Sequence, residues 1–160
     1  MAAKRKYYGL GFILVAMLLL TSLYLQFYDG FQPCPLCMLQ RFAFLLLGVF
    51  YLIGLLCYKW GFLRVTASVL ALLSAMLGLA LAGRQIWLQH FPSANGTECG
   101  VSLEYMLQVL PLNEVAQRIF QGTAECTARG WEFLYLNMAE WSLLWFVLFF
   151  LLSAYLFKKR

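Results

Sequence analysis

Two cysteines three residues apart, Cys34 and Cys37, are the residues of this chain best suited to chemistry. Thiols at this spacing can close a small, reactive disulfide. Pro35 and Met38 bracket a predicted helix start, because proline is tolerated in the first turn, where its missing N–H is not needed. The positive end of that helix would favour the thiolate of Cys37. Arg41 follows one turn later on the same face as Cys37, so a thiolate, a cation and a disulfide partner are expected to meet there.

An arginine in the first turn of a membrane helix can simply extend its charge to the interface. Beside two vicinal thiols, a functional role for Arg41 is the favoured interpretation.

The composition indicates which kind of elements position these residues. The chain has 160 residues, of which 63% are hydrophobic and only 12% are charged, which is far too apolar for a soluble domain of this size.

Four segments without a charged residue are long enough to span a bilayer: 7–28, 42–58, 65–83 and 141–157. We therefore predict an all-α membrane protein, a four-transmembrane-helix bundle that forms a single domain over residues 1–160. With their flanks, the spans are expected at about 7–28, 38–58, 63–87 and 139–157, separated by outer loops at about 29–37 and 88–138. The net charge of +5 does not indicate nucleic-acid binding, because no basic patch alternates with aromatic residues in a polar region.

The placement of the charges predicts the orientation. Basic residues precede span one, separate spans two and three, and follow span four: Lys4, Arg5, Lys6, Lys59, Arg64, Lys158, Lys159 and Arg160. Four spans bring all of these to one side, which the positive-inside rule makes cytoplasmic. Every acidic residue falls on the other side, together with Cys34, Cys37, Cys99 and Cys126. Both termini are therefore expected in the cytoplasm, and in a bacterium the four cysteines would face the periplasm, where disulfides persist.

Three further features have no predicted chemistry. Cys57 lies near the cytoplasmic end of span two, about 30 Å along the helix from Cys37, and cannot join the other cysteines. Span three carries small residues at helical spacing, which indicates close helix packing: Ala67, Ala71, Ser74, Ala75, Gly78 and Ala82. Its outer end is marked by Arg84, Gln85 and Trp87, and His90, the only histidine, is expected to be structural or solvated.

The long outer loop carries Cys99 and Cys126, and loops of this length are usually functional or mobile. Between the two cysteines, the run Pro111-Leu112-Asn113 resembles a helix start. The apolar residues that follow recur at helical spacing: Leu112, Val115, Ala116, Ile119 and Phe120. This pattern predicts a short amphipathic helix that lies on the membrane or packs on the bundle.

Several kinds of cysteine site compete. Zinc is disfavoured, because structural sites usually show two close pairs and Cys99 and Cys126 are far apart. Covalent haem attachment is excluded, because Met38 and not histidine follows Cys37. A structural disulfide suits Cys99 and Cys126 in isolation, but it suits Cys34 and Cys37 poorly, because so small a ring stabilises little.

A redox relay accounts for both pairs. A loop pair can be reached by a soluble partner, and a pair at the lipid boundary can be reached by a lipid-soluble acceptor. A membrane quinone is the natural acceptor, and Arg41 could hold a quinone carbonyl and stabilise the charge that develops on it.

At this point the chain resembles the DsbB family, inner-membrane oxidases that reoxidise the periplasmic dithiol oxidase DsbA. The resemblance covers nearly the whole chain and rests on four spans, Cys34-Pro35-Leu36-Cys37 followed by Arg41, the Cys99 and Cys126 loop, and Gly130-Trp131-Glu132-Phe133-Leu134 before Trp141. It implies a quinone cofactor, a DsbA-like partner and contact with membrane lipid, and no metal.

The resemblance also implies residue roles. Cys34 and Cys37 would be the quinone-coupled pair, with Cys37 in contact with the quinone, and Arg41 would be the quinone-site arginine. Cys99 would form the mixed disulfide with the DsbA-like protein, and Cys126 would be its partner. Some members place a histidine near the quinone at the outer end of span three, but His90 lies too far along to be assigned that role.

Two other hypotheses stay open on the sequence. One is a non-enzymatic membrane scaffold with a structural loop disulfide. The other is a quinone-coupled oxidoreductase of the vitamin K epoxide reductase type. The widely spaced pair Cys99 and Cys126, in the loop between spans three and four, argues against this type. Neither the quinone, ubiquinone or menaquinone, nor the particular DsbA-like partner follows from the residues.

Overall fold

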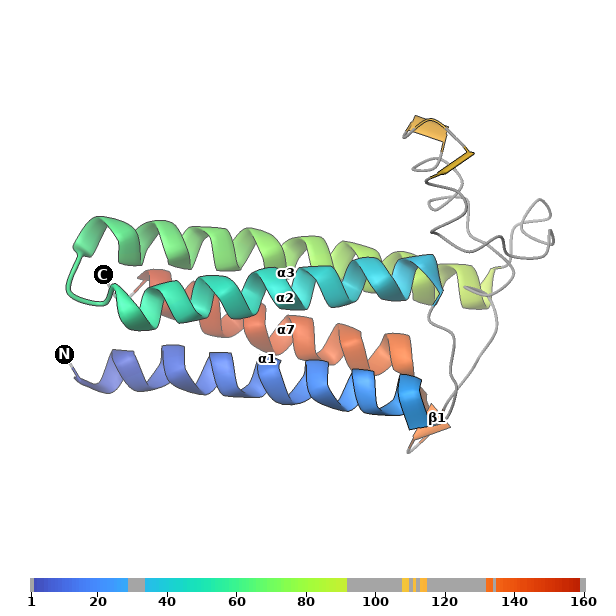
Figure 1. The fold of residues 1–160 in the computed structure, drawn as a ribbon, viewed down its shortest axis with the longest axis horizontal. Coiled ribbons are helices and arrows are strands. Elements are labelled where there is room, and N and C mark those ends of the chain that lie inside the picture. The colour runs from blue at the N-terminus through green and yellow to red at the C-terminus, as the bar shows by residue number, and fades with distance from the viewer. Residues whose placement is uncertain are drawn as a thin grey trace.

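Four long helices lie side by side along one axis (Figure 1): α1 (Ala2–Tyr28), α2 (Pro35–Leu56), α3 (Gly61–His90) and α7 (Met138–Lys158). The structure is a computed structural model that describes residues 2–28, 34–91, 108–109, 111, 113–114, 132–133 and 135–158. Each long helix is apolar enough and long enough to cross a membrane. The predicted four-helix membrane bundle is confirmed, and the chain is a multi-pass membrane protein.

Helix α3 has extensive contacts with two of the other long helices. It packs extensively against both α2 and α7, whereas α1 packs mainly against α2 and touches α7 only lightly. Helix α1 therefore leaves much of its surface uncovered, and side chains such as Met17 and Leu20 are more than half exposed. In a bilayer these apolar side chains face lipid, where they need no protein cover.

Small residues set the spacing between α3 and its neighbours. The six small residues that the sequence analysis identified in span three are all buried in α3. At Gly78, an added Cβ would lie only 2.1 Å from a ring carbon of Phe146 on α7. The ring of Phe146 therefore occupies the space that a side chain at Gly78 would need. The close packing predicted from the sequence is confirmed.

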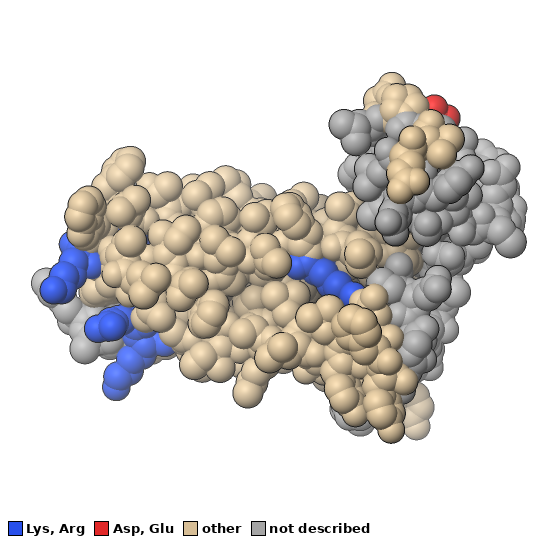
Figure 2. Space-filling view, viewed as in Figure 1, with Lys and Arg blue, Asp and Glu red and all other residues tan. Residues whose placement is uncertain are grey.

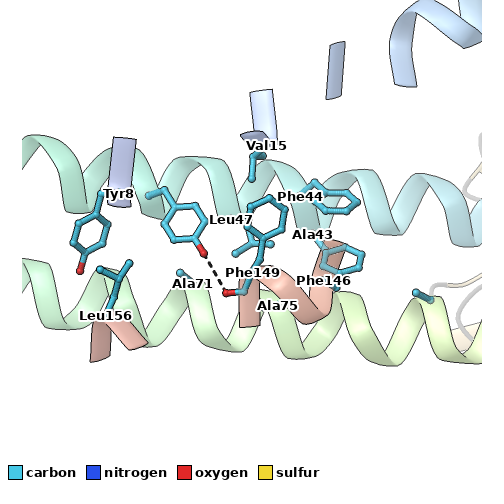
Figure 3. Packing of buried hydrophobic residues seen from close by; sticks show 12 residues of the cluster. Tyr8, Val15, Ala43, Phe44, Leu47, Ala71, Ala75, Phe146, Phe149 and Leu156 are labelled. Atoms are coloured by element: carbon cyan, nitrogen blue, oxygen red, sulfur yellow. Dashed lines mark hydrogen bonds between the residues drawn. The ribbon is translucent and has the colours of Figure 1, made fainter. Parts of the chain in front are cut away.

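The core of the bundle consists of aromatic and aliphatic side chains (Figure 3). It also contains paired hydroxyl groups. Phe44 of α2 stacks on Phe146 of α7 with ring centroids 4.0 Å apart. Tyr51 donates a hydrogen bond to the backbone oxygen of Phe149, at 3.2 Å, and its hydroxyl lies 2.8 Å from that of Ser153. Hydroxyl groups placed in an apolar interior need such partners, so these bonds fix the register of α2 against α7.

Basic side chains gather at the end of the bundle where both termini lie (Figure 2). At this end Tyr8 of α1 lies beside Tyr58, and the guanidinium of Arg64 lies 5.3 Å from the centre of the Tyr58 ring. Figure 2 therefore agrees with the distribution of charge on which the predicted orientation rests.

At the other end, a small hairpin leads into α7. Strand β1 (Glu132–Phe133) pairs antiparallel with β2 (Leu136–Asn137), and Tyr135 turns the chain with a φ of 64°. Asn137 and Glu140 then cap α7 reciprocally, each side chain accepting a bond from the backbone N–H of the other, at 3.0 and 2.8 Å. The Asn137 amide also donates to Gln89 of α3, at 2.7 Å, which ties the start of α7 to the end of α3.

Candidate functional site

The vicinal cysteines lie at the first turn of α2, at the end of the bundle opposite the two termini. Cys34 is the N-cap residue, Pro35 is in the first turn, and the Cys34 sulfur accepts a bond from the Cys37 backbone N–H at 3.3 Å. The two sulfurs are 2.8 Å apart. The predicted helix start is confirmed, and Cys37 lies at the positive end of the helix dipole as expected. The pair can interconvert between dithiol and disulfide with little movement of the backbone.

The surroundings of the two sulfurs are mostly apolar. Cys34 is 4% exposed and belongs to a buried cluster with Leu36, Leu81 and Leu88, while Cys37 is partly exposed at its edge. Two of these leucines belong to α3, so the cluster lies at the contact between α2 and α3. An apolar wall raises the strength of any hydrogen bond to a sulfur, because water does not compete for it.

A pair of buried glutamines supplies the polar contacts of the sulfurs. The Gln85 amide nitrogen on α3 lies 3.2 Å from the Cys37 sulfur and 3.6 Å from the Cys34 sulfur. Gln40, on α2, donates to the Gln85 carbonyl oxygen at 2.7 Å. Sequence reasoning treated Gln85 only as a marker of the outer end of span three. Its position 48 residues from Cys37 gave no signal of the contact.

Arg41 is half-buried and is held by α1. Its guanidinium donates to the side-chain oxygen of Gln26 and to the backbone oxygen of Ser22, the latter at 3.3 Å. Along α2, Arg41 follows Cys37 by four residues, which is about one helical turn. The guanidinium is thus held by a neighbouring helix.

The remaining candidate residues divide into two groups. His90 ends α3 with an exposed ring whose Nδ1 lies 3.0 Å from the Ile86 oxygen, and Cys57 caps the far end of α2, away from the sulfur pair. Cys99 and Cys126 lie outside the described residues, as does most of the predicted amphipathic helix, of which the structure describes residues 113–114 as helical.

Comparison with known proteins gives the family of the chain. The sequence model described as "Disulfide bond formation protein DsbB" matches residues 4–156. The chain belongs to the DsbB family. Among its relatives, the "Disulfide bond formation protein B" of Azoarcus sp. is 44% identical over 93% of this chain and 89% of the relative. The protein of the same name from Marinobacter nauticus is 39% identical over 96% of this chain and 91% of the relative.

A third relative, "Disulfide bond formation protein B 1" of Pseudomonas aeruginosa, is 38% identical over the whole of this chain and 98% of its own length. Membership of the family identifies the chain as a disulfide oxidoreductase that takes part in disulfide bond formation.

Proposed function

We propose that the protein is a quinone-dependent thiol oxidase, which reoxidises a DsbA-like periplasmic dithiol oxidase and passes the electrons to a membrane quinone. One observation carries most of the proposal: two sulfurs 2.8 Å apart lie in an apolar cluster at the end of a membrane bundle, beside a half-buried arginine. In this proposal the partly exposed Cys37, at the end of a bundle that crosses the bilayer, is reached from the bilayer. A lipid-soluble acceptor can therefore reach it.

Electrons enter, in this proposal, through Cys99 and Cys126 in the long loop. A thiolate of the DsbA-like protein attacks Cys99 and breaks the Cys99–Cys126 disulfide, and a second thiolate then releases the oxidised partner. The reduced loop pair transfers two electrons to the Cys34–Cys37 disulfide by the same exchange. Each thiol that reacts releases one proton, so the relay moves two electrons and two protons per disulfide formed.

The residues around Cys37 fit a quinone. Met38 and Phe42, which neighbour Cys37 and Arg41 along α2, expose 42% and 55% of their surface, so apolar side chains border the site on its lipid side. The guanidinium of Arg41 is a donor in that apolar setting. A bound quinone would act as the two-electron oxidant of the dithiol. Arg41 would orient a carbonyl oxygen and stabilise the negative charge that develops on it, while Cys37 presents its sulfur.

The location belongs to the same proposal. A bacterial inner membrane, with both termini in the cytoplasm, places the sulfur pair at the periplasmic side, where a DsbA-like protein is found. The single domain of residues 1–160 then serves as a bridge between a soluble dithiol and the quinone pool. Whether that quinone is ubiquinone or menaquinone is decided by offering each to the purified protein.

The test is quinone reduction by the purified protein with a reduced DsbA-like protein as donor. Cys37→Ser should abolish the reaction, whereas Cys57→Ser, at the other end of α2, should leave it intact. Arg41→Ala should raise the KM for quinone or lower kcat by about tenfold or more, because a charged hydrogen bond of about 1.5–3 kcal/mol is lost. Arg64→Ala, the same charge change at the other end of α3, is the matched control.

Normal quinone reduction by Cys37→Ser would refute the proposed electron path. Equal quinone kinetics in Arg41→Ala and the wild-type protein would remove Arg41 from the quinone site and leave the thiol relay standing.

A further inference from the structure

The amide of Gln85 is placed where a charge on sulfur would form. Its nitrogen lies 3.2 Å from the Cys37 sulfur, which is within hydrogen-bond reach, and 3.6 Å from the Cys34 sulfur. Gln85 is 4% exposed and reaches the sulfurs across the α2–α3 contact. A buried amide directed at two sulfurs is a costly arrangement unless the bond is made, so its presence indicates a role at the cysteine pair.

Gln40 decides which end of that amide faces the sulfurs. Its own amide nitrogen lies 2.7 Å from the Gln85 carbonyl oxygen, and Gln40 is 3% exposed. A flipped Gln85 would place its nitrogen against the Gln40 nitrogen and lose that bond, because two donors would then face each other. With Gln40 donating to that oxygen, the Gln85 amide nitrogen lies nearer to the Cys37 sulfur, at 3.2 Å, than the Gln85 carbonyl oxygen does, at 3.6 Å. This orientation favours a negatively charged sulfur.

We propose that Gln85, oriented by Gln40, is a positioning residue that stabilises the thiolate of Cys37 formed when the Cys34–Cys37 disulfide is reduced. This inference rests on the proposed function, in which that disulfide accepts electrons. Arg41 contributes charge from the α1 side, whereas Gln85 contributes a directed hydrogen bond from the α3 side.

The chemical step identifies the sulfur that benefits. A donor thiolate attacks the Cys34 sulfur, a new S–S bond forms, and the Cys34–Cys37 bond breaks with its electron pair left on Cys37. A second donor thiolate then attacks the mixed disulfide and releases Cys34. Two electrons pass from the donor dithiol to the pair, and the donor thiols release two protons. The shorter distance of Gln85 to Cys37 makes Cys37 the better stabilised leaving group in the first step.

The reduction potential of the pair measures this stabilisation directly. The full chain is prepared with serine at the three other cysteines, Cys57, Cys99 and Cys126, and is equilibrated in a dithiol–disulfide buffer without quinone. Gln85→Leu should shift the equilibrium about tenfold toward the disulfide, which corresponds to about 30 mV. Gln40→Leu should shift it in the same direction by a smaller factor, because the Gln85 amide can then flip.

Combining the two substitutions distinguishes orientation from general packing. If Gln40 acts only through Gln85, the double variant should show the same potential as Gln85→Leu alone, whereas two independent packing effects would add. Ser74→Ala is the control, because its buried hydroxyl donates to the Leu70 oxygen of its own helix, at 2.9 Å, and within the described part of the chain no other bond of it is seen. The reduction potential should not change in this variant.

An unchanged potential in Gln85→Leu, or additive shifts in the double variant, would overturn the inference. If Gln85→Leu fails to fold, Gln40→Leu carries the test, and an unchanged potential there would overturn it equally. Because the measurement contains no quinone and no DsbA-like protein, its failure leaves the proposed electron path intact. Failure of the quinone assay, in turn, would not change the reduction potential of the Cys34–Cys37 pair, because that potential is measured without quinone.

Discussion

Replacing Gly78 with alanine tests the packing of α3 on α7 most directly. The new Cβ would lie 2.1 to 2.3 Å from three carbons of the Phe146 ring, far inside ordinary contact distance. Phe146 is fully buried and stacked on Phe44 at 4.0 Å, so its ring has little room to move aside. Overpacking of this kind typically costs about 1–3 kcal/mol. The α3–α7 contact should open, and the bundle should lose stability.

Gly83→Ala is the matched control. Gly83 lies in the same helix, but nothing lies within 4 Å of an added Cβ. Both substitutions change the helix propensity by the same amount, about 1 kcal/mol in favour of alanine in soluble helices, so the difference between the two variants isolates the packing cost. We therefore expect Gly78→Ala to be less stable than Gly83→Ala by about 1–3 kcal/mol.

Unfolding by increasing SDS in mixed micelles, followed by circular dichroism, measures this difference. The double variant Gly78→Ala with Phe146→Leu should recover part of the loss, because a smaller side chain leaves space for the methyl group. Equal stability of the two alanine variants would refute the packing described here. Gln85 follows Gly78 by seven residues, about 10 Å along α3, so an opened α3–α7 contact should also weaken the Gln85 contact with the sulfurs.

Three further substitutions test other contacts. Asn137→Ala removes the cap of α7 and should lower stability by about 1 kcal/mol in the same SDS titration, and an unchanged midpoint would contradict the cap. Tyr51→Phe removes the bonds to Ser153 and the Phe149 oxygen and should cost about 0.6–1.7 kcal/mol, measured in that titration, whereas a stabilised variant would contradict the pairing. Gln26→Leu releases the guanidinium of Arg41 and should raise the KM for quinone with little change in stability; an unaltered KM would show that Arg41 needs no support from α1.

Much of the fold was predictable because a bilayer permits few solutions. A chain without water around it must satisfy its backbone internally, so long apolar segments have to form helices. The helix start at the cysteine pair was equally local, because Pro35 and the two cysteines act within a single turn of α2. Small residues at helical spacing in α3 correctly indicated close packing, since only small side chains allow such an approach.

The partners of the site residues were not predictable in the same way. Arg41 shares a helix face with Cys37, yet its hydrogen bonds go to Gln26 and Ser22 on α1. The hydrogen bond to Cys37 comes instead from Gln85 on α3, held by Gln40. These contacts depend on the rotation of each helix about its axis and on its depth relative to its neighbours. In a membrane protein, lipid-facing and core-facing surfaces are both apolar, so the hydrophobic pattern does not specify that rotation.

The sequence by itself thus determined a membrane bundle with a reactive cysteine pair at the start of its second helix, because those features follow from composition and from spacing within one turn. Only the tertiary structure decided which helix supplies a hydrogen bond to the sulfurs and which one holds the cation, because both depend on how four nearly uniform apolar helices pack together.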